Sequence, residues 1–131
     1  IRERTEYLAL GSSIEFYGHV EDVRDFLAKT NILVLPSKNE ALGIVLLEAM
    51  ALEKPVVAFD CGGPGEIISS DSDGMLVEPG DLDGLTAAIV GLLRDEQTAR
   101  SMGARGRQTV LKSFSSKAMV DSIMKVYDEL G

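Results

Sequence analysis

The sequence predicts an α/β fold, in which helices flank both faces of a parallel sheet. Two short apolar runs, 32–35 and 56–59, have the length and composition of strands that are buried on both faces. Segments with helical periodicity alternate with such runs, and this alternation is the pattern of a parallel sheet. The 131 residues suffice for one domain with a hydrophobic core, so we expect a single domain over 1–131.

The first part of the chain predicts a helix, a strand and a second helix. We expect the first helix over 1–10, with Gly11 as its C-terminal stop. The run 14–17 predicts a short strand that is closed by Gly18. A helix is expected next, over 22–29.

The central unit consists of a strand, a turn and a helix. Pro36 cannot donate to a sheet ladder, so the strand 32–35 should stop there. Turn-forming residues at 37–39 precede a helix expected over 42–52. That helix is apolar almost all round, which predicts that it is buried, and only Glu48 interrupts its apolar run.

A glycine-rich turn follows the second predicted strand, 56–59. Its three glycines, within 60–65, allow close approach of another backbone or of a ligand. Because ligands of open parallel sheets bind beyond the carboxyl ends of the strands, this turn should border the same cleft as Glu40. The remaining elements are expected to be a helix over 66–69, a strand over 74–77, helices over 81–94 and 96–112, and a last helix that is capped by Ser115 and ends at Leu130.

The composition excludes several classes of function. The net charge is −8, from 21 acidic and 13 basic residues, which argues against nucleic acid as a partner. Cys61 is the only cysteine, so an internal disulfide is excluded and a reducing compartment fits. No apolar run is long enough for a membrane span and no signal peptide is recognisable, so we expect a cytoplasmic protein. The basic residues of the 96–112 helix are interpreted as a solvated face rather than as a phosphate patch. His19, the only histidine, is interpreted as a solvated loop residue rather than as a general base.

Two glutamates stand out in the central unit. Glu40 and Glu48 are eight positions apart, which corresponds to roughly 12 Å along one helix. Glycoside hydrolases hold their two carboxyl groups about 5–9.5 Å apart, so a hydrolytic pair is not expected.

The start of the 42–52 helix lies between these glutamates. Its N–H groups and the positive end of its dipole favour an anion, and Gly43 lets a ligand approach the backbone closely. A carboxylate, an anion site and a second carboxylate suit a long ligand with hydroxyls at both ends and phosphates in the middle. A structural alternative stays open, in which Glu48 lies on a narrow wet stripe and Glu40 only stabilises the helix start.

The chain resembles the group 1 glycosyltransferases, retaining enzymes of the GT-B fold that carry a Glu-x7-Glu signature. The signature corresponds to Glu40 and Glu48, and the resemblance covers nearly the whole chain in order. The matching segments are 14–20, 35–37, 40–43, 47–51, 54–58, 62–68 and 74–77. The sequence departs from the family at Ala41 and Leu42, where Gly and Phe are usual, whereas Gly43 is kept.

The resemblance implies the donor-binding, C-terminal domain of such an enzyme, with a Rossmann-like sheet. Glu40 would hold hydroxyls of the donor sugar as the catalytic glutamate, and Glu48 would accept from the ribose. The N–H groups of Leu42, Gly43 and Ile44 would bind the diphosphate. The turn from Gly18 to Val20 would border the base. The implied substrate is a nucleoside-diphosphate sugar, and no metal or other cofactor is expected.

The resemblance also implies parts that lie outside this chain. We expect a domain that is truncated on its N-terminal side, with four of six strands, and an upstream domain that binds the acceptor. The two upstream strands would separate the 14–17 strand from the 32–35 strand. Either the 14–17 and 32–35 strands pair directly with each other here, or another copy of the chain covers an exposed sheet edge and forms a dimer. The chain alone should be catalytically silent, and membrane association of the parent protein is left open.

The sequence also fits two alternatives to a transferase. A non-catalytic binding or interaction module could keep the fold but lose the donor, and the departure at Ala41 and Leu42 is its best support. A sugar-nucleotide epimerase of the GT-B fold is the other. The sequence does not identify the base, the sugar or the acceptor.

Overall fold

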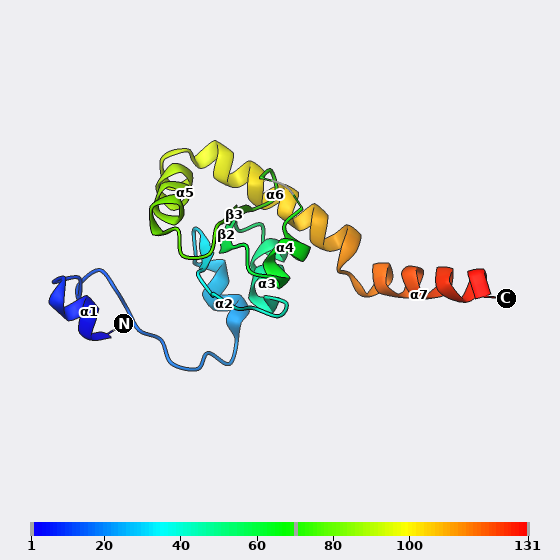
Figure 1. The fold of residues 1–131 in the computed structure, drawn as a ribbon, viewed down its shortest axis with the longest axis horizontal. Helices are drawn as coiled ribbons and strands as arrows, with labels where there is room; N and C mark the ends of the chain where they lie inside the picture. Colours follow the sequence, from blue (N-terminus) through cyan, green and yellow to red (C-terminus); the bar gives the residue numbers. More distant parts are fainter. Residues whose placement is uncertain (1, 70, 131) are drawn as a thin grey trace.

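The computed structural model describes residues 2–69 and 71–130. Its centre is a parallel sheet in the order β1-β2-β3 (Figure 1). The strands are β1 (Leu33–Leu35), β2 (Val56–Phe59) and β3 (Met75–Val77). Leu33 lies beside Val56 in the register of β1 and β2, and Phe59 lies beside Val77 in that of β2 and β3. The predicted α/β fold with a parallel sheet is confirmed.

The helices begin at polar caps where the sequence offers them. The carboxylates of Asp22, Asp81 and Asp95 each accept a hydrogen bond from an N–H in the first turn that follows. The Ser115 hydroxyl accepts from the Ala118 N–H at 3.2 Å, as expected for the cap of the last helix. The helices are α1 (Arg2–Tyr7), α2 (Val23–Ala28), α3 (Ile44–Ala51), α4 (Gly63–Ile67), α5 (Leu82–Arg94), α6 (Glu96–Ser113) and α7 (Ser116–Leu130).

Strand β2 carries the core because its side chains alternate between two apolar clusters. Val56 and Ala58 pack on one face, against buried side chains of α2, α3 and the end of α4. Val57 and Phe59 pack on the other face, against buried side chains of α5 and α6. All four residues are buried, so the prediction for this strand is confirmed.

Helix α6 crosses the body (Figure 1). It packs on α3 through glycines. Gly103 and Gly106 are buried, and a Cβ on Gly103 would lie 1.9 Å from the carbonyl oxygen of Glu53. The opposite side of the helix is exposed and carries its arginine and lysine side chains, as predicted for a solvated face. The close packing of the glycine face was not foreseen.

The predicted strand at 14–17 is wrong. This segment lies outside the sheet, with Ile14 and Phe16 exposed, and the ring of Tyr17 packs edge-on against Phe26 with ring centroids 5.0 Å apart. A strand exists only when a neighbour accepts its backbone hydrogen bonds, and the sequence pattern does not show whether that neighbour is present. Direct pairing with β1 is therefore also wrong, whereas the dimer through an exposed sheet edge stays a prediction.

Two other elements are less buried than predicted. Strand β1 is half-buried, because it is an edge of the sheet and has a neighbour on one side only. Helix α3 buries Leu46, Ala49 and Met50, but Ile44, Glu48 and Ala51 form an exposed stripe at helical spacing. The expectation of a helix buried all round is therefore wrong.

The boundaries of α1 and α4 also differ from expectation. Helix α1 ends at Tyr7 rather than Leu10, since Ala9 takes a left-handed φ of 54°. The Leu10 N–H then donates to the Thr5 carbonyl, which is the Schellman pattern, with Ala9 rather than Gly11 as its left-handed residue. Residue 1, which the prediction placed in this helix, lies outside the described residues. Helix α4 begins at Gly63 rather than at Glu66.

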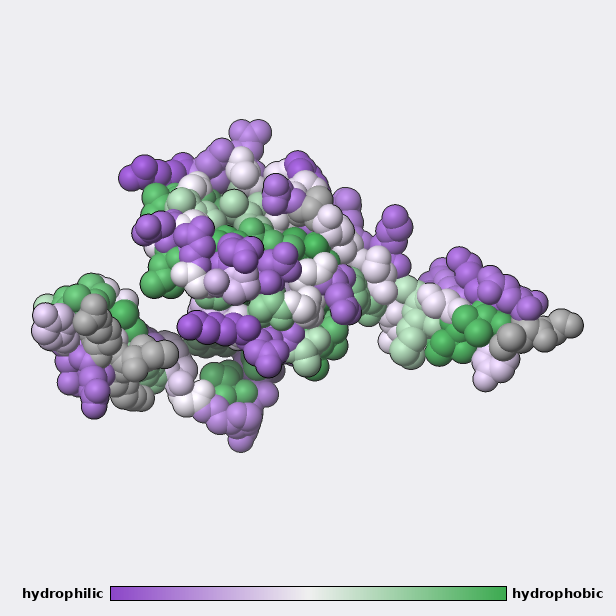
Figure 2. Space-filling view, viewed as in Figure 1, coloured by the Kyte–Doolittle hydropathy of each residue, from purple (hydrophilic) through white to green (hydrophobic). Residues whose placement is uncertain are grey.

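Helix α7 extends away from the sheet at the C-terminal end of the molecule (Figure 1). Figure 2 shows apolar side chains gathered along one side of this helix. The exposed apolar residues of α7 are Met119, Val120, Ile123, Met124, Val126 and Tyr127. Among the described residues, none of the helices combines the length and hydropathy that a membrane span requires.

Candidate functional site

The candidate site lies beyond the carboxyl ends of β1 and β2, where each strand turns into a helix. The chain leaves β1 at Leu35 and enters α3 after Gly43, which caps the helix in a left-handed conformation with φ 78° and ψ 50°. A side chain at this position would be strained, and its Cβ would approach Leu46 Cδ1 to 3.1 Å. Gly43 thus has a conformational role in addition to the close approach predicted from the sequence.

Glu40 lies at the tip of α3. The backbone N–H of Gly43 donates to Glu40 Oε1 at 3.2 Å, and the glutamate is half-buried. The carboxylate therefore stabilises the helix start, as the structural alternative predicts. Leu42 and Ile44, the other two residues predicted to bind the diphosphate through their N–H groups, are exposed on either side of Gly43.

The glycine turn after β2 packs directly on the Glu40 loop. Glu40 pairs with Gly62 in an isolated parallel bridge, and the Gly63 N–H donates to the Glu40 carbonyl at 3.0 Å. A Cβ on Gly63 would lie 2.5 Å from Leu42 Cα, so only glycine permits this approach of two backbones. This turn therefore lies beside Glu40, whereas a shared ligand cleft stays a prediction.

A thiol adds a second link between the two turns. Cys61 Sγ donates to the Ser37 carbonyl at 2.9 Å. Sequence reasoning missed this contact, because a lone cysteine gives no signal of its partner. The two turns together form one backbone platform at the carboxyl edge of the sheet.

Glu48 lies on the exposed stripe of α3, on the side that faces α2. It lines a cavity of about 400 Å³, together with Glu21, Asp22 and Arg24 at the start of α2 and Leu27 further along it. Its exposure fits the wet stripe of the structural alternative and also leaves the carboxylate accessible to a ligand.

The predicted base-binding turn lies beside that cavity. Gly18 is exposed, and Val20 is half-buried and lines a neighbouring cavity of about 450 Å³. The two cavities share Asp22, which is the N-cap of α2. His19 is exposed, as expected for a solvated loop residue. The structure therefore groups Glu40 with Gly43, Gly62 and Gly63, and groups Glu48 with the start of α2.

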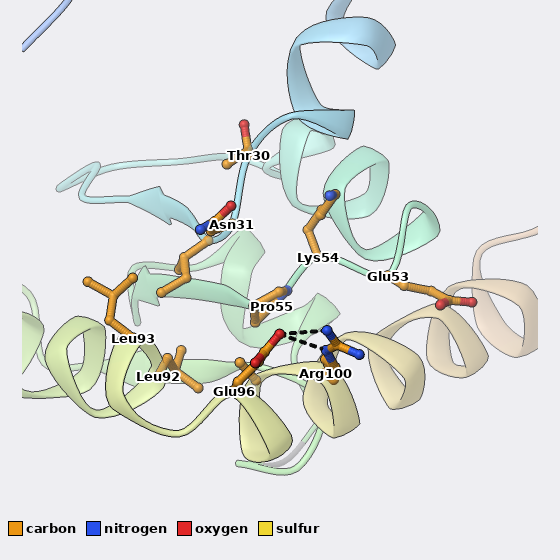
Figure 3. Close-up of a pocket in the computed structure, with 11 residues that line it drawn as sticks. Thr30, Asn31, Glu53, Lys54, Pro55, Leu92, Leu93, Glu96 and Arg100 are labelled. Atoms are coloured by element: carbon orange, nitrogen blue, oxygen red, sulfur yellow. Dashed lines mark hydrogen bonds and ion pairs between the residues drawn. The ribbon is translucent and has the colours of Figure 1, made fainter.

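A further cavity lies at the amino ends of the strands, on the side of the sheet opposite to the candidate site. It has a volume of about 460 Å³ and is lined by Asn31 and Pro55, which precede β1 and β2 (Figure 3). Its charged groups already have partners within the protein, since Lys54 Nζ donates to the Ala28 carbonyl at 2.7 Å and Arg100 pairs with Glu96 at 2.5 Å. This cavity is separate from the candidate site.

The candidate site has hydrogen-bond donors for an anion but no ligand set for a metal. Within 2–69 and 71–130, no three His, Cys, Asp or Glu side chains are grouped so that they could hold a metal ion. The chemistry available at the tip is that of oriented N–H groups, a helix dipole and carboxylate acceptors.

Known proteins resemble the chain in both sequence and fold. The N-acetyl-alpha-D-glucosaminyl L-malate synthase of Bacillus anthracis is 34% identical over 127 residues, which are 97% of this chain and 33% of that protein. The chain thus spans about a third of the length of this curated relative. The C-terminal domain of LpcC, a glycosyl transferase group 1 family protein of Francisella tularensis, has a TM-score of 0.80 and 26% identity over 88% of this chain and 60% of that one.

A further solved structure and a family model also match the chain. The structure of Anabaena HepE in complex with UDP has a TM-score of 0.89 over 98% of this chain and 35% of that one, and its 24% identity shows the fold alone. The family model described as "Glycosyl transferases group 1" matches residues 1–109, which is most of the chain. On this match, and with a parallel sheet and helix tip that fit the GT-B fold, the chain belongs to the group 1 glycosyl transferases.

Proposed function

We propose that this chain is the donor-binding part of a retaining glycosyltransferase, which holds a nucleoside-diphosphate sugar while the sugar moves to an acceptor hydroxyl. The observation that carries the proposal is the platform of two turns at the tip of α3, in which Gly43 is left-handed and Gly63 packs against Leu42. Such a platform presents backbone N–H groups and a positive dipole end to phosphates.

In this proposal each predicted residue keeps one role. The N–H groups of Leu42, Gly43 and Ile44 bind the diphosphate, and their fixed orientation stabilises the negative charge that develops on the leaving group. Glu40 holds hydroxyls of the donor sugar. Glu48 accepts from the ribose in the cavity between α2 and α3. The turn from Gly18 to Val20 borders the base, and no metal is needed.

The departure from the family at residues 41 and 42 is compatible with this role. Ala41 and Leu42 are both exposed, so their side chains do not distort the backbone platform beneath them. The kept Gly43 is the residue whose left-handed conformation the platform requires. A donor site is therefore favoured over a module that has lost its ligand.

The chain alone is expected to bind the nucleoside-diphosphate sugar but not to transfer the sugar. The reason is that the acceptor would be held by an upstream part of the protein that this chain does not include. The Bacillus anthracis relative is about three times as long as this chain, which is consistent with such a part.

Titration calorimetry with UDP, GDP and ADP tests the proposal. One of the three should bind, and Glu48→Ala should weaken that binding about tenfold, because the ribose loses a charged acceptor. A variant with the same loss of charge on α7, Glu129→Ala, should bind as the wild type does. Equal binding by Glu48→Ala and wild type would contradict the role of Glu48, and binding of none of the three would contradict the donor site. Sugar transfer by the purified chain with any donor would contradict the predicted lack of turnover.

A further inference from the structure

The Glu40 carboxylate and a bound diphosphate require the same hydrogen-bond donor. In the structure the Gly43 N–H donates to Glu40 Oε1 at 3.2 Å. The proposed function assigns this N–H to the diphosphate and the carboxylate to sugar hydroxyls. A backbone amide has a single proton, and the carboxylate and a phosphate oxygen are both negatively charged, so the two acceptors compete for it.

The backbone around Glu40 is fixed, so only its side chain is free to exchange partners. The Glu40 carbonyl accepts from the Gly63 N–H at 3.0 Å, and Glu40 pairs with Gly62 across the two turns. Gly63 packs so closely on Leu42 that the loop has no room to shift toward it. Rotation about the side-chain bonds of Glu40 is sufficient to free the Gly43 N–H.

We infer, on the basis of the proposed function, that Glu40 regulates the donor site by competing with the diphosphate for the Gly43 N–H. Sugar hydroxyls hold the carboxylate away from the amide, and the amide then binds a phosphate oxygen. A nucleoside diphosphate without a sugar has no such hydroxyls, so the carboxylate stays on the amide and its negative charge repels the phosphates. The site therefore prefers the sugar-bearing donor over the sugar-free nucleotide.

The competition predicts opposite effects of one substitution on two ligands. Glu40→Gln removes the charge and replaces a charged acceptor by a weaker neutral one. Inorganic pyrophosphate and the nucleoside diphosphate that the wild type binds should then bind about fivefold more tightly, whereas the glucose conjugate of that nucleotide should bind about tenfold more weakly. A residue that only stabilised the helix start would weaken both kinds of ligand together.

Amide NMR of the 131-residue chain tests this inference, because weak binding is measurable and the Gly43 resonance reports the site itself. The probes are pyrophosphate, which has no base and no sugar, and whichever of UDP, GDP and ADP the wild type binds, free and as its glucose conjugate. Glu129→Gln makes the same change of charge on the distant α7 and should leave all three dissociation constants unchanged. Glu40→Ala, which removes the acceptor altogether, should tighten pyrophosphate binding in the same direction and serves if Glu40→Gln unfolds.

The outcomes separate this inference from the proposed function. If Glu48→Ala weakens binding of the nucleoside diphosphate while neither Glu40 variant tightens binding of that nucleotide or of pyrophosphate, the competition is overturned and the donor site stands. If the wild type binds none of UDP, GDP, ADP and their glucose conjugates, the donor site is overturned and the competition with it.

Discussion

Thr109 on α6 donates a hydrogen bond from Oγ1 to Asp73 Oδ2 at 2.8 Å, across 36 positions of sequence. The Ser69 hydroxyl donates to the same oxygen at 2.5 Å, and Asp73 is only 3% exposed. A buried carboxylate is tolerated where hydrogen bonds compensate its desolvation. Asp73 therefore connects the middle of α6 to the loop that precedes β3 through hydrogen bonds.

Removal of the hydrogen bond between Thr109 and Asp73 should lower the stability of the fold without changing the candidate site. Thr109→Val keeps the shape of the side chain but takes a donor from a buried carboxylate, so we expect a loss of about 1.5–3 kcal/mol in the free energy of unfolding. Urea denaturation measures this loss. The double variant Thr109→Val with Asp73→Asn should lose less than the sum of the single variants, because both changes break the same contact. Additive losses would show that the two side chains do not interact.

The glycines of α6 and α5 should respond in opposite directions to alanine. At Gly103 an added Cβ meets the Glu53 carbonyl oxygen at 1.9 Å, so Gly103→Ala should cost about 1–3 kcal/mol or more by forcing α6 away from α3. At Gly91, within α5, nothing lies within 4 Å of an added Cβ. Gly91→Ala should therefore stabilise the protein by about 0.5–1 kcal/mol through helix propensity. Thermal denaturation of both variants checks the prediction, and equal effects would contradict the glycine contact.

Gly63→Ala should damage the candidate site specifically. The added Cβ would lie 2.5 Å from Leu42 Cα and would push the two turns of the platform apart. We expect weaker binding of the nucleoside diphosphate, by about tenfold or more, since the N–H groups lose their common orientation. Gly11→Ala, where nothing lies within 4 Å of the new Cβ, is the matched control and should bind normally. Calorimetry with the diphosphate that the wild type binds decides between the two outcomes.

The Asp95 cap gives the start of α6 a pH dependence with a definite sign. Hydrogen bonds from the Thr98 backbone N–H and, next in size, from its hydroxyl hold the pKa of Asp95 below its ordinary value of 3.8. Stabilisation by this carboxylate is therefore fully present above 3.8 and is lost as the pH falls through the lower, folded-state pKa. Asp95→Asn should lose less stability than the wild type on acidification. Urea denaturation across the acid range measures this difference, with Asp121→Asn as a control of the same charge change.

Much of the fold was predictable because its signals are local. The apolar run 56–59 and the caps Asp81 and Ser115 specify their elements by composition and by a single side chain each. The strand predicted at 14–17 failed because strand formation depends on a partner that the sequence window does not contain. The glycine contact of Gly103 with Glu53 depends on the crossing of two helices, which no local pattern records.

The candidate site was predictable only in part for a similar reason. The spacing of Glu40 and Glu48 and the kept Gly43 indicated a helix tip between two acids, and the structure has that arrangement along the chain. The sequence alone does not show two contacts of the site. The hydrogen bond between Glu40 and the Gly43 amide depends on a side-chain rotamer, and the contact of Gly63 with Leu42 depends on tertiary packing.

Helix α7 extends beyond the packed body, and every side chain from 119 to 129 is exposed. With 15 residues, α7 is close to the length of roughly 12–15 residues at which an isolated helix is marginal in water, so this segment draws little support from its own backbone. It should open independently of the rest of the molecule and exchange its amide hydrogens many times faster than the amides of β2. Deuterium uptake should therefore divide the chain into a slow unit around β2 and a fast C-terminal unit, with the boundary near Phe114.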